Sequence, residues 1–308
     1  MSQTTTEDVL APLRRAFAND AVKVAVMYIA IWVVFYAFGD HLGYGNSGIL
    51  SLVRRVTFLA AVYGIVVLAL NIQWGYAGLF NIGVAGFMAV GAYTVAMLSS
   101  PPAGSPPGLG LPIPIGVLGG ILAATLVGLV AALPALRLKA DYLAIVTVAI
   151  SEIIRITYNS PAFSDVTGGA RGFGNLPTSP VEALLLQDPT SPASEATSLG
   201  ETVFSFAAEY GISQFAVINT LYTVGVLLVL LVVYLLLERA GKSPYGRVLK
   251  AIREDETAAQ SLGKDTQNFK VRAFALGCGL MGLAGILWFA MGPRASVTPQ
   301  TFRPNITF

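Results

Sequence analysis

Charged residues are scarce in this sequence. Only 12% of its 308 residues are Asp, Glu, Lys or Arg, whereas an ordinary soluble domain carries about 25%. Hydrophobic residues make up 55% of the chain, and the mean hydropathy is +0.68. So little charge leaves too little polar surface to keep a body of this size soluble. The apolar residues also come in long runs, as bilayer-spanning helices require. We therefore expect an integral membrane protein.

Cysteine and histidine are nearly absent as well. Cys278 is the one cysteine and lies in an apolar run, so we expect a buried core residue. His41 is the one histidine and lies in a Gly-rich turn. A membrane enzyme would need clustered ligands or a nucleophile–base pair, and this composition favours neither catalysis nor a metal site. The net charge of +2 gives nucleic-acid binding no electrostatic support.

Seven apolar runs approach the length of about 20 residues that a spanning helix needs. The runs are Val22–Phe38, Val56–Ile72, Gly78–Leu98, Pro112–Leu136, Tyr142–Tyr158, Phe215–Leu237 and Phe269–Met291. The first follows a polar N-terminal segment and is long enough to be a retained helix instead of a cleaved signal. The sequence thus predicts an all-α polytopic membrane protein with about seven transmembrane helices and, between the last two, a cytoplasmic amphipathic helix.

The distribution of cations predicts the orientation in the plasma membrane. The long loop Asn159–Gln214 contains six acidic residues and a single cation, Arg171, so we place it outside. Eight cations lie between the end of the sixth run and the first residues of the seventh: Arg239, Lys242, Arg247, Lys250, Arg253, Lys264, Lys270 and Arg272. Cytoplasmic loops are rich in Lys and Arg near span ends, so we place the eight-cation loop inside the cell. Counting back along the spans then places Arg137–Lys139 and the N-terminus inside as well. Arg54 and Arg55 then face outward, which implies either snorkelling at the interface or a miscounted span.

These assignments divide the chain into segments. Residues 1–20 form a cytoplasmic segment, 21–292 the membrane domain and 293–308 an extracytoplasmic tail. Within the domain, 159–214 is the long outer loop and 239–268 the inner loop. Residues 180–214 are rich in Ser, Thr, Pro and acids, and we expect them to be poorly ordered. A flap or a contact with a binding protein is the alternative.

The third run opens on a Gly-rich stretch, residues 74–86, with four glycines. Glycine destabilises a helix interior by about 1 kcal/mol, but small residues let membrane helices pack closely. Broken helices at membrane depth occur where backbone lines a cavity. Both interpretations stay open, and the second makes Gly75, Gly78, Asn81 and Gly83 candidates for a substrate pathway.

The fifth run contains an acid–base pair, Glu152 and Arg155, three residues apart on one helix face. Thr147, Ser151 and Arg155 follow at steps of four and form a polar stripe. Ionisable residues inside a membrane often mark a substrate path. The alternative is a self-neutralising pair that locks two helices together. Thr147, Ser151, Glu152 and Arg155 are therefore the second set of pathway candidates.

The clearest local pattern spans Ser243 to Gly263. Ser243 suits an N-cap, Pro244 the first helical position and Gly263 a C-terminal stop. Apolar residues follow helical spacing between them: Tyr245, Val248, Leu249, Ile252, Ala259 and Leu262. We expect one short amphipathic helix at the cytoplasmic surface. Lipid binding is the alternative, but the mixed charges of residues 253–256 suit a protein partner better than anionic headgroups.

Several segments together resemble the LivM-like subunit of the branched-chain amino-acid ABC-transporter permeases. Residues 243–263 (SPYGRVLKAIREDETAAQSLG) are similar to that family's coupling segment. Residues 73–83 resemble its Gly-rich "GYAGL…G" motif, and residues 136–147 resemble its "LRL–DYLAIVT" motif, with the stretch EIIR after it at 152–155. Thr167, Gly168 and Gly169 belong to a stretch similar to its "TGG–G" loop. The matches extend from about residue 60 to 291.

The resemblance implies one membrane half of an ATP-driven importer. Expected partners are a second, LivH-like permease subunit, two ATP-binding subunits inside, a substrate-binding protein outside, and membrane lipid. ATP and Mg²⁺ would be used by those subunits, with no cofactor bound by this chain; Gly241-Lys242-Ser243 is not a P-loop because Leu236 replaces the required glycine. The residues implied in ATPase coupling are Ser243, Pro244, Gly246, Arg247, Ala251, Ile252, Arg253, Glu254, Asp255, Ala258, Ala259, Leu262 and Gly263. Thr167, Gly168 and Gly169 join the pathway candidates.

Two questions stay open at this point. The carried substrate is a branched-chain amino acid by default, with related amino acids, urea or short amides as alternatives. An ion-coupled secondary transporter or channel is the competing function, although Glu152 is the one acid deep in an apolar run. The chain ends at Phe308, where the family continues through further spans, so we expect a fragment or a shortened gene.

Overall fold

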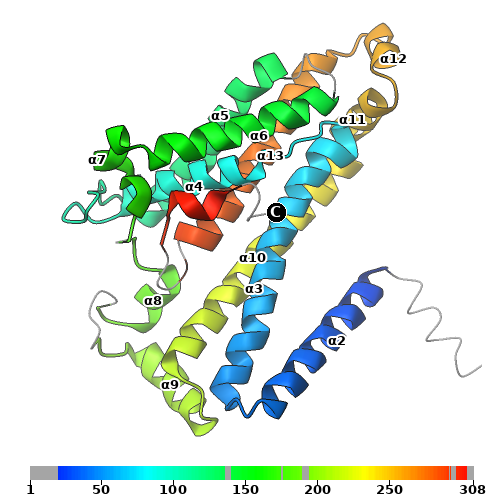
Figure 1. Cartoon of the computed structure of the whole chain (residues 1–308). Helices are drawn as coiled ribbons and strands as arrows, with labels where there is room; N and C mark the ends of the chain where they lie inside the picture. Colours follow the sequence, from blue (N-terminus) through cyan, green and yellow to red (C-terminus); the bar gives the residue numbers. More distant parts are fainter. Residues whose placement is uncertain are drawn as a thin grey trace, which may run out of the picture.

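The computed structural model describes residues 20–135, 140–174, 176–188, 194–290, 292 and 296–303. Within these ranges the chain is built from helices, joined by turns and two isolated β-bridges, Phe173–Val297 and Leu186–Ala196 (Figure 1). The predicted segment 1–20 lies almost wholly outside the described residues, and so does the predicted inner connection Arg137–Lys139.

Six helices in the described residues are long and apolar enough to cross a membrane, and α4 (Val84–Ser99) is a shorter apolar one. The long ones are α2 (Asp20–His41), α3 (Asn46–Leu70), α5 (Ile113–Ala135), α6 (Ala140–Asn159), α10 (Gln214–Lys242) and α13 (Thr266–Gly285). Their number and type agree with the predicted all-α polytopic fold. The second span begins at Asn46 and not near Val56, so Arg54 and Arg55 lie inside α3.

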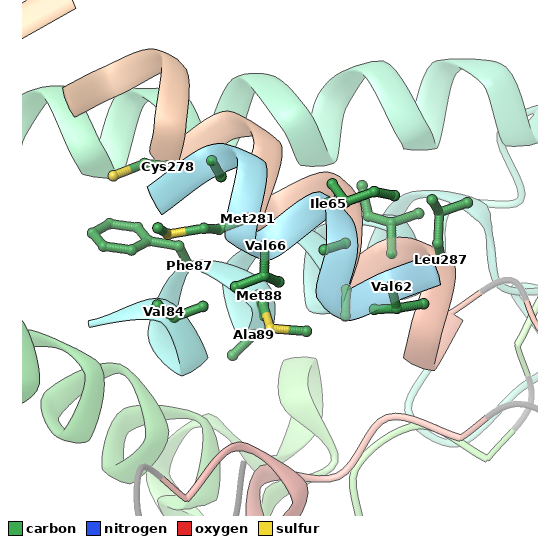
Figure 2. Packing of buried hydrophobic residues seen from close by; sticks show 14 of the residues in the cluster. Val62, Ile65, Val66, Val84, Phe87, Met88, Ala89, Cys278, Met281 and Leu287 are labelled. Carbon is green, nitrogen blue, oxygen red and sulfur yellow. The ribbon is translucent and has the colours of Figure 1, made fainter. Parts of the chain in front are cut away.

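Helix α4 lies at the centre of the bundle, against α5, α6 and α13 (Figure 1). Its Phe87, Met88 and Tyr93 are fully buried. Figure 2 shows Phe87 and Met88 packed with Val66 of α3 and Met281 of α13. A helix that is apolar all round belongs in the interior, which explains why the shortest apolar helix is the most completely enclosed.

Glycine allows the central helices to cross at close range. A Cβ added to Gly91 of α4 would overlap the carbonyl of Gly282 in α13, and one added to Gly285 would overlap the carbonyl of Met88. Gly128 of α5 likewise leaves room for Cys278, which is buried as expected. Membrane helices associate through such close contacts because lipid supplies little hydrophobic drive between them.

The two groups of short helices lie at opposite ends of the α3–α10 pair (Figure 1). Helices α11 (Pro244–Glu254) and α12 (Glu256–Ser261) lie at one end, and α8 (Pro180–Leu185) and α9 (Ser198–Glu209) at the other. The predicted cytoplasmic and extracytoplasmic loops are thus separated by the length of the bundle, as the orientation requires.

The expectation that residues 180–214 are poorly ordered is wrong for its described parts. Ser179 and Glu182 form a capping box at the start of α8, and Thr197 and Ser213 cap α9 and α10. The two short helices share a small apolar cluster with the start of α10: Leu185, Phe204, Ala207, Val217 and Ile218. Polar composition concealed this cluster because its apolar members are far apart in sequence.

Part of the predicted tail folds back onto the bundle. Residues 296–303 include the 3₁₀-helix η5 (Pro299–Phe302), and Phe302 is buried beside Phe289 and Tyr93. The backbone of Val297 exchanges two hydrogen bonds with Phe173 in the outer loop. The outer loop and the tail therefore form one layer over the end of α4 and α6.

The close crossing of α4 and α13 predicts a large effect of Gly91→Val. The valine has no space against the Gly282 backbone, and overpacking typically destabilises by about 1–3 kcal/mol. The thermal midpoint of the purified protein in detergent should fall clearly. Gly225→Val is the matched control, because nothing lies within 4 Å of a Cβ at that position of α10. Equal midpoints for the two variants would contradict the close crossing.

Candidate functional site

The helical path breaks between α3 and α4, at the Gly-rich stretch. Helix α3 continues as the π-helix η1 (Asn71–Tyr76), and helix resumes only at Val84. The predicted third span, Gly78–Leu98, is therefore wrong at its start, since residues 78–83 are not helical. Gly78 has φ of +71°, a left-handed conformation that glycine adopts without strain. Short π-helical turns are frequent at functional sites.

Two buried amides hold this break together. The Gln73 side chain donates to the Phe274 carbonyl of α13 at 2.8 Å and accepts from the Asn81 amide at 3.1 Å. The Asn81 oxygen in turn accepts from the backbone N–H of Gly83 at 2.8 Å. Gly277 makes room for Gln73, because a Cβ there would overlap its amide. The network supplies partners for polar groups that helix breaking leaves exposed in an apolar interior.

The polar stripe of α6 completes the network. Thr147 Oγ1 accepts from the backbone N–H of Ile82 at 3.1 Å. Ser151 Oγ donates to the carbonyl of Gly83 at 2.7 Å and accepts from the N–H of Gly86 at 3.0 Å. Both side chains are buried. The structure thus brings together two predicted sets, the Gly-rich stretch and the α6 stripe.

The break is also closely packed. A Cβ on Gly83 would lie 2.5 Å from the Thr147 carbonyl oxygen, and one on Gly86 would lie 2.6 Å from the Cα of Ser151. Close packing and a broken helix, which the sequence left as alternatives, are therefore both present. That the break lines a substrate pathway stays a prediction.

Glu152 and Arg155 form an ion pair within one turn of α6, as their spacing predicts. Arg155 Nε donates to a Glu152 carboxylate oxygen at 2.8 Å, and Arg155 Nη2 donates to the other oxygen. The Arg155 side chain is 15% exposed and that of Glu152 is 39% exposed. Both bonds lie along one helix, so the pair neutralises itself on α6. A role of either residue in the pathway stays a prediction.

Thr167, Gly168 and Gly169 lie beyond the far end of α6 from the break. Thr167 Oγ1 donates to the Tyr158 carbonyl and accepts from the N–H of Gly169. Gly168 has φ of +76° and ends the short helix α7 (Ser164–Thr167). These contacts make the turn a support for the outer layer, and the structure does not bring it together with Asn81 and Gly83.

The segment from Ser243 to Gly263 forms two helices and not the single helix predicted. Asp255 is extended and its side chain accepts from the N–H of Ala258, so it ends α11 and caps α12. Asp favours caps over helix interiors because its carboxylate competes for backbone N–H groups. Pro244 occupies the first turn as expected, but Ser243 makes no side-chain cap and donates to Ala240.

The apolar face of this segment is confirmed except at its end. Gly246, Leu249, Ile252 and Ala259 are buried, whereas Leu262 is 79% exposed, contrary to its assignment to that face. The outward side carries further predicted coupling residues in exposed positions: Arg247, Ala251, Glu254, Asp255, Ala258 and Gly263. Arg253 is also exposed, but its side chain turns toward the helix break.

Further contacts orient α11 and α12 on the bundle. Lys270 of α13 donates to Glu256 at 2.6 Å, and Tyr245 stacks on Phe269 with ring centroids 5.5 Å apart. Burial raises the pKa of Tyr245, and Arg272 partly offsets that rise, so the phenol stays protonated at neutral pH. The two helices are thereby fixed to the start of α13.

Three contacts join this segment directly to the break. Arg253 Nη1 donates to the carbonyl of Gly75, and the Arg253 side chain lies over Gly78. The Lys250 ammonium lies 4.9 Å from the centroid of the Tyr76 ring. Gly241, at the end of α10, leaves space for the Tyr76 hydroxyl. The two regions that the sequence predicts to be functional are in physical contact.

Sequence reasoning missed Gln73 and Tyr76, which link the break to α13 and to α11. A polar Gln between an apolar helix and a Gly-rich stretch was the available signal for Gln73. Nothing in the local pattern indicated the contacts of Tyr76, because its partners lie in α10 and α11, far along the chain.

Comparison with known proteins adds to this geometry. Residues 52–308 match the family described as the permease component of the branched-chain amino acid transport system. The chain belongs to this family. It is 32% identical over 289 residues to the high-affinity branched-chain amino acid transport system permease protein LivM of Escherichia coli and, equally, to that of Salmonella typhimurium.

A more distant relative is the probable branched-chain amino acid transport permease protein LivM of Methanocaldococcus jannaschii, 29% identical over 268 residues, which cover 78% of this chain and 67% of the relative. The two bacterial alignments cover 93% of this chain but 62% of each relative, so the chain spans less than two thirds of their length. No solved structure matches the chain. The relatives are named as transport permeases, in keeping with a membrane transport protein.

The bond between Thr147 and Ile82 predicts a local effect of Thr147→Val. The isosteric valine leaves the Ile82 N–H without its acceptor, which costs about 1–3 kcal/mol for a buried donor. Hydrogen exchange in a peptide covering residues 78–83 should become about tenfold faster or more. Thr157→Val on the same helix is the control, since the Thr157 hydroxyl bonds only within its own turn. Unchanged exchange in Thr147→Val would argue against this support of the break.

Proposed function

We propose that this chain is a permease subunit of an ATP-binding-cassette importer. It would translocate branched-chain amino acids, or related amino acids, urea or amides, across the plasma membrane by alternating access. Two ATP-binding subunits would dock on the cytoplasmic side, where the N-terminus also lies, and α11 and α12 would enter the groove of an ATP-binding subunit. A LivH-like permease subunit would complete the pathway, and an extracytoplasmic binding protein would deliver the substrate. Family membership and the names of the relatives support this assignment.

The contact between α11 and the helix break is the observation that carries the mechanism. A partner that moves α11 pulls on Arg253, whose guanidinium bonds the Gly75 carbonyl. The break is the compliant point between α3 and α4, because residues 78–83 lack regular helical bonds. Its other attachments, Thr147 and Ser151, lead into α6. Motion at the surface would thus reach three spans through one polar network.

The outward side of α11 and α12 suits a protein groove. Leu262 is 79% exposed at one end of this side. Glu254 pairs with Arg253 at 2.7 Å, but its side chain is still 71% exposed and can meet a partner. An exposed leucine among charges of both signs is typical of a protein contact, whereas anionic headgroups repel Glu254 and Asp255. The same side would carry the force that ATP binding generates in the partners.

Energy coupling separates an importer of this class from an ion-coupled transporter. The full complex is reconstituted in proteoliposomes with the binding protein and radiolabelled leucine. Uptake should require internal ATP and persist when ionophores dissipate the ion gradients. Uptake that survives ATP depletion but stops with the gradients would reject the importer assignment in favour of the ion-coupled one.

Arg253→Glu should uncouple ATP hydrolysis from transport. The change removes a bond from a charged donor to Gly75, worth about 1.5–3 kcal/mol, so leucine uptake per ATP hydrolysed should fall about tenfold or more. Glu254→Lys, a reversal on the outward side, should also lower the ratio through weaker docking.

Lys264→Glu is the matched control, an equal charge reversal at an exposed cation beyond Gly263. It should keep the wild-type ratio of leucine transported to ATP hydrolysed. The thermal midpoint of each complex shows whether the spans stay folded. Wild-type coupling in Arg253→Glu would contradict the transmission through Gly75.

A further inference from the structure

A second polar region lies far from the break, between α3, α10 and the π-helix η4 (Ile286–Ala290) that ends α13. It is a cavity of about 510 Å³, within the range of small-molecule sites. Arg54 and Arg55 line it together with Asn219 and Tyr222 of α10, Trp288 of η4 and Ser296. It therefore contains the two arginines that disagree with the predicted charge distribution.

The arginines give the cavity an unbalanced positive charge. Arg54 Nη1 donates to the Asn219 side-chain oxygen at 3.3 Å, a neutral partner. Arg54 Nε is buried without a hydrogen-bond partner. No carboxylate occurs among the described residues that line the cavity. Arg54 is half-buried and Arg55 is exposed, so the cost falls on the one buried Nε donor that lacks an acceptor. The planar donors of a guanidinium match a carboxylate. The cavity is therefore suited to a small carboxylate.

Aromatic rings also line the cavity. Phe58 and Tyr222 have ring centroids 6.0 Å apart, and Trp288 stacks on Phe289 at 4.8 Å. The Tyr222 hydroxyl donates to the Leu287 carbonyl, so this polar group already has a partner within the protein. The π-helical turn of η4 places Trp288 and Phe289 beside each other at this point. These rings offer an apolar contact surface for the side chain of a bound ligand.

We infer that this cavity is a binding site for an apolar amino acid, with the carboxylate on Arg54 and Arg55 and the side chain against Phe58, Tyr222 and Trp288. The inference deepens the proposed function and rests on it. In the proposed orientation the cavity opens toward the outer side, because Arg54 and Asn219 lie near the outer ends of α3 and α10. On this inference, Arg54 and Arg55 lie on the outer side because they bind substrate. The tendency of Lys and Arg to gather in cytoplasmic loops therefore does not apply to these two residues.

The test is protection of an engineered cysteine from a neutral maleimide. Ser296→Cys places a thiol on the exposed rim of the cavity in the complete complex, and the native Cys278 is fully buried and replaced by alanine. Leucine at millimolar concentration should slow labelling severalfold, whereas leucinol, which lacks the carboxylate, should not. Adding Arg54→Gln should abolish the protection by leucine. Ser205→Cys, an exposed site on α9 away from the cavity, is the matched control and should label equally in all conditions.

Three results would overturn the site: equal labelling of Ser296→Cys with and without leucine, equal protection by leucine and leucinol, or protection by anionic lipid alone. The comparison of leucine with leucinol does not depend on whether Arg54→Gln folds. ATP-driven uptake by the same cysteine variant is measured in parallel. Uptake without protection rejects this site and leaves the proposed function standing, whereas absence of ATP-driven uptake in the wild-type complex rejects the proposed function itself.

Discussion

The structure depends on satisfying the polar groups of a broken helix inside an apolar bundle. A continuous helix pairs its own backbone, but the chain between η1 and α4 cannot, and lipid offers no partners. Asn81 supplies one of the missing bonds from the break itself, and Thr147 and Ser151 supply others from α6. Gln73 of η1 holds the Asn81 side chain in place and bonds to α13. Every one of these side chains is buried. The positions of α3, α4, α6 and α13 are thereby fixed to one another at a single level.

The same constraint explains the small residues around the break. Polar side chains as short as Ser and Thr reach the backbone of a neighbouring helix only when the two helices are nearly in contact. Gly83 and Gly86 give α6 that access, and Gly277 gives it to Gln73. A Cβ at any of these positions separates a donor from its acceptor as well as causing a steric overlap. Close packing and hydrogen bonding therefore depend on the same glycines. A small displacement at Gly75 would for this reason affect several helices.

The sequence predicts the fold class, the apolar spans and the amphipathic segment well, because composition and helical spacing are local properties. It fails where distant residues decide the structure. Residues 180–188 and 194–209 fold because α10 completes their apolar cluster. The interruption at Asp255 is different, since it is a local cap to Ala258 that helical spacing alone overlooked. The polar stripe of α6 was visible, but its partner in the Gly-rich stretch was not. For Arg54 the charge rule identified an anomaly, and only the arrangement of α3, α10 and η4 surrounds it with aromatic rings.

Helix α3 links the two polar regions of the molecule. With η1 it forms an uninterrupted stretch of 31 residues from Asn46 to Tyr76, in which Arg54 and Tyr76 are separated by about 33 Å at 1.5 Å per residue. Local changes in a packed helix die out over such a distance, but a helix that tilts as a rigid body carries displacement from end to end. Residues 78–83 interrupt the helical path between η1 and α4 at one end of this stretch, and the π-helical turn η4 ends α13 beside Arg54 at the other. Irregular backbone thus lies beside both of the polar regions that α3 joins, in η1 and the break at one and in η4 at the other.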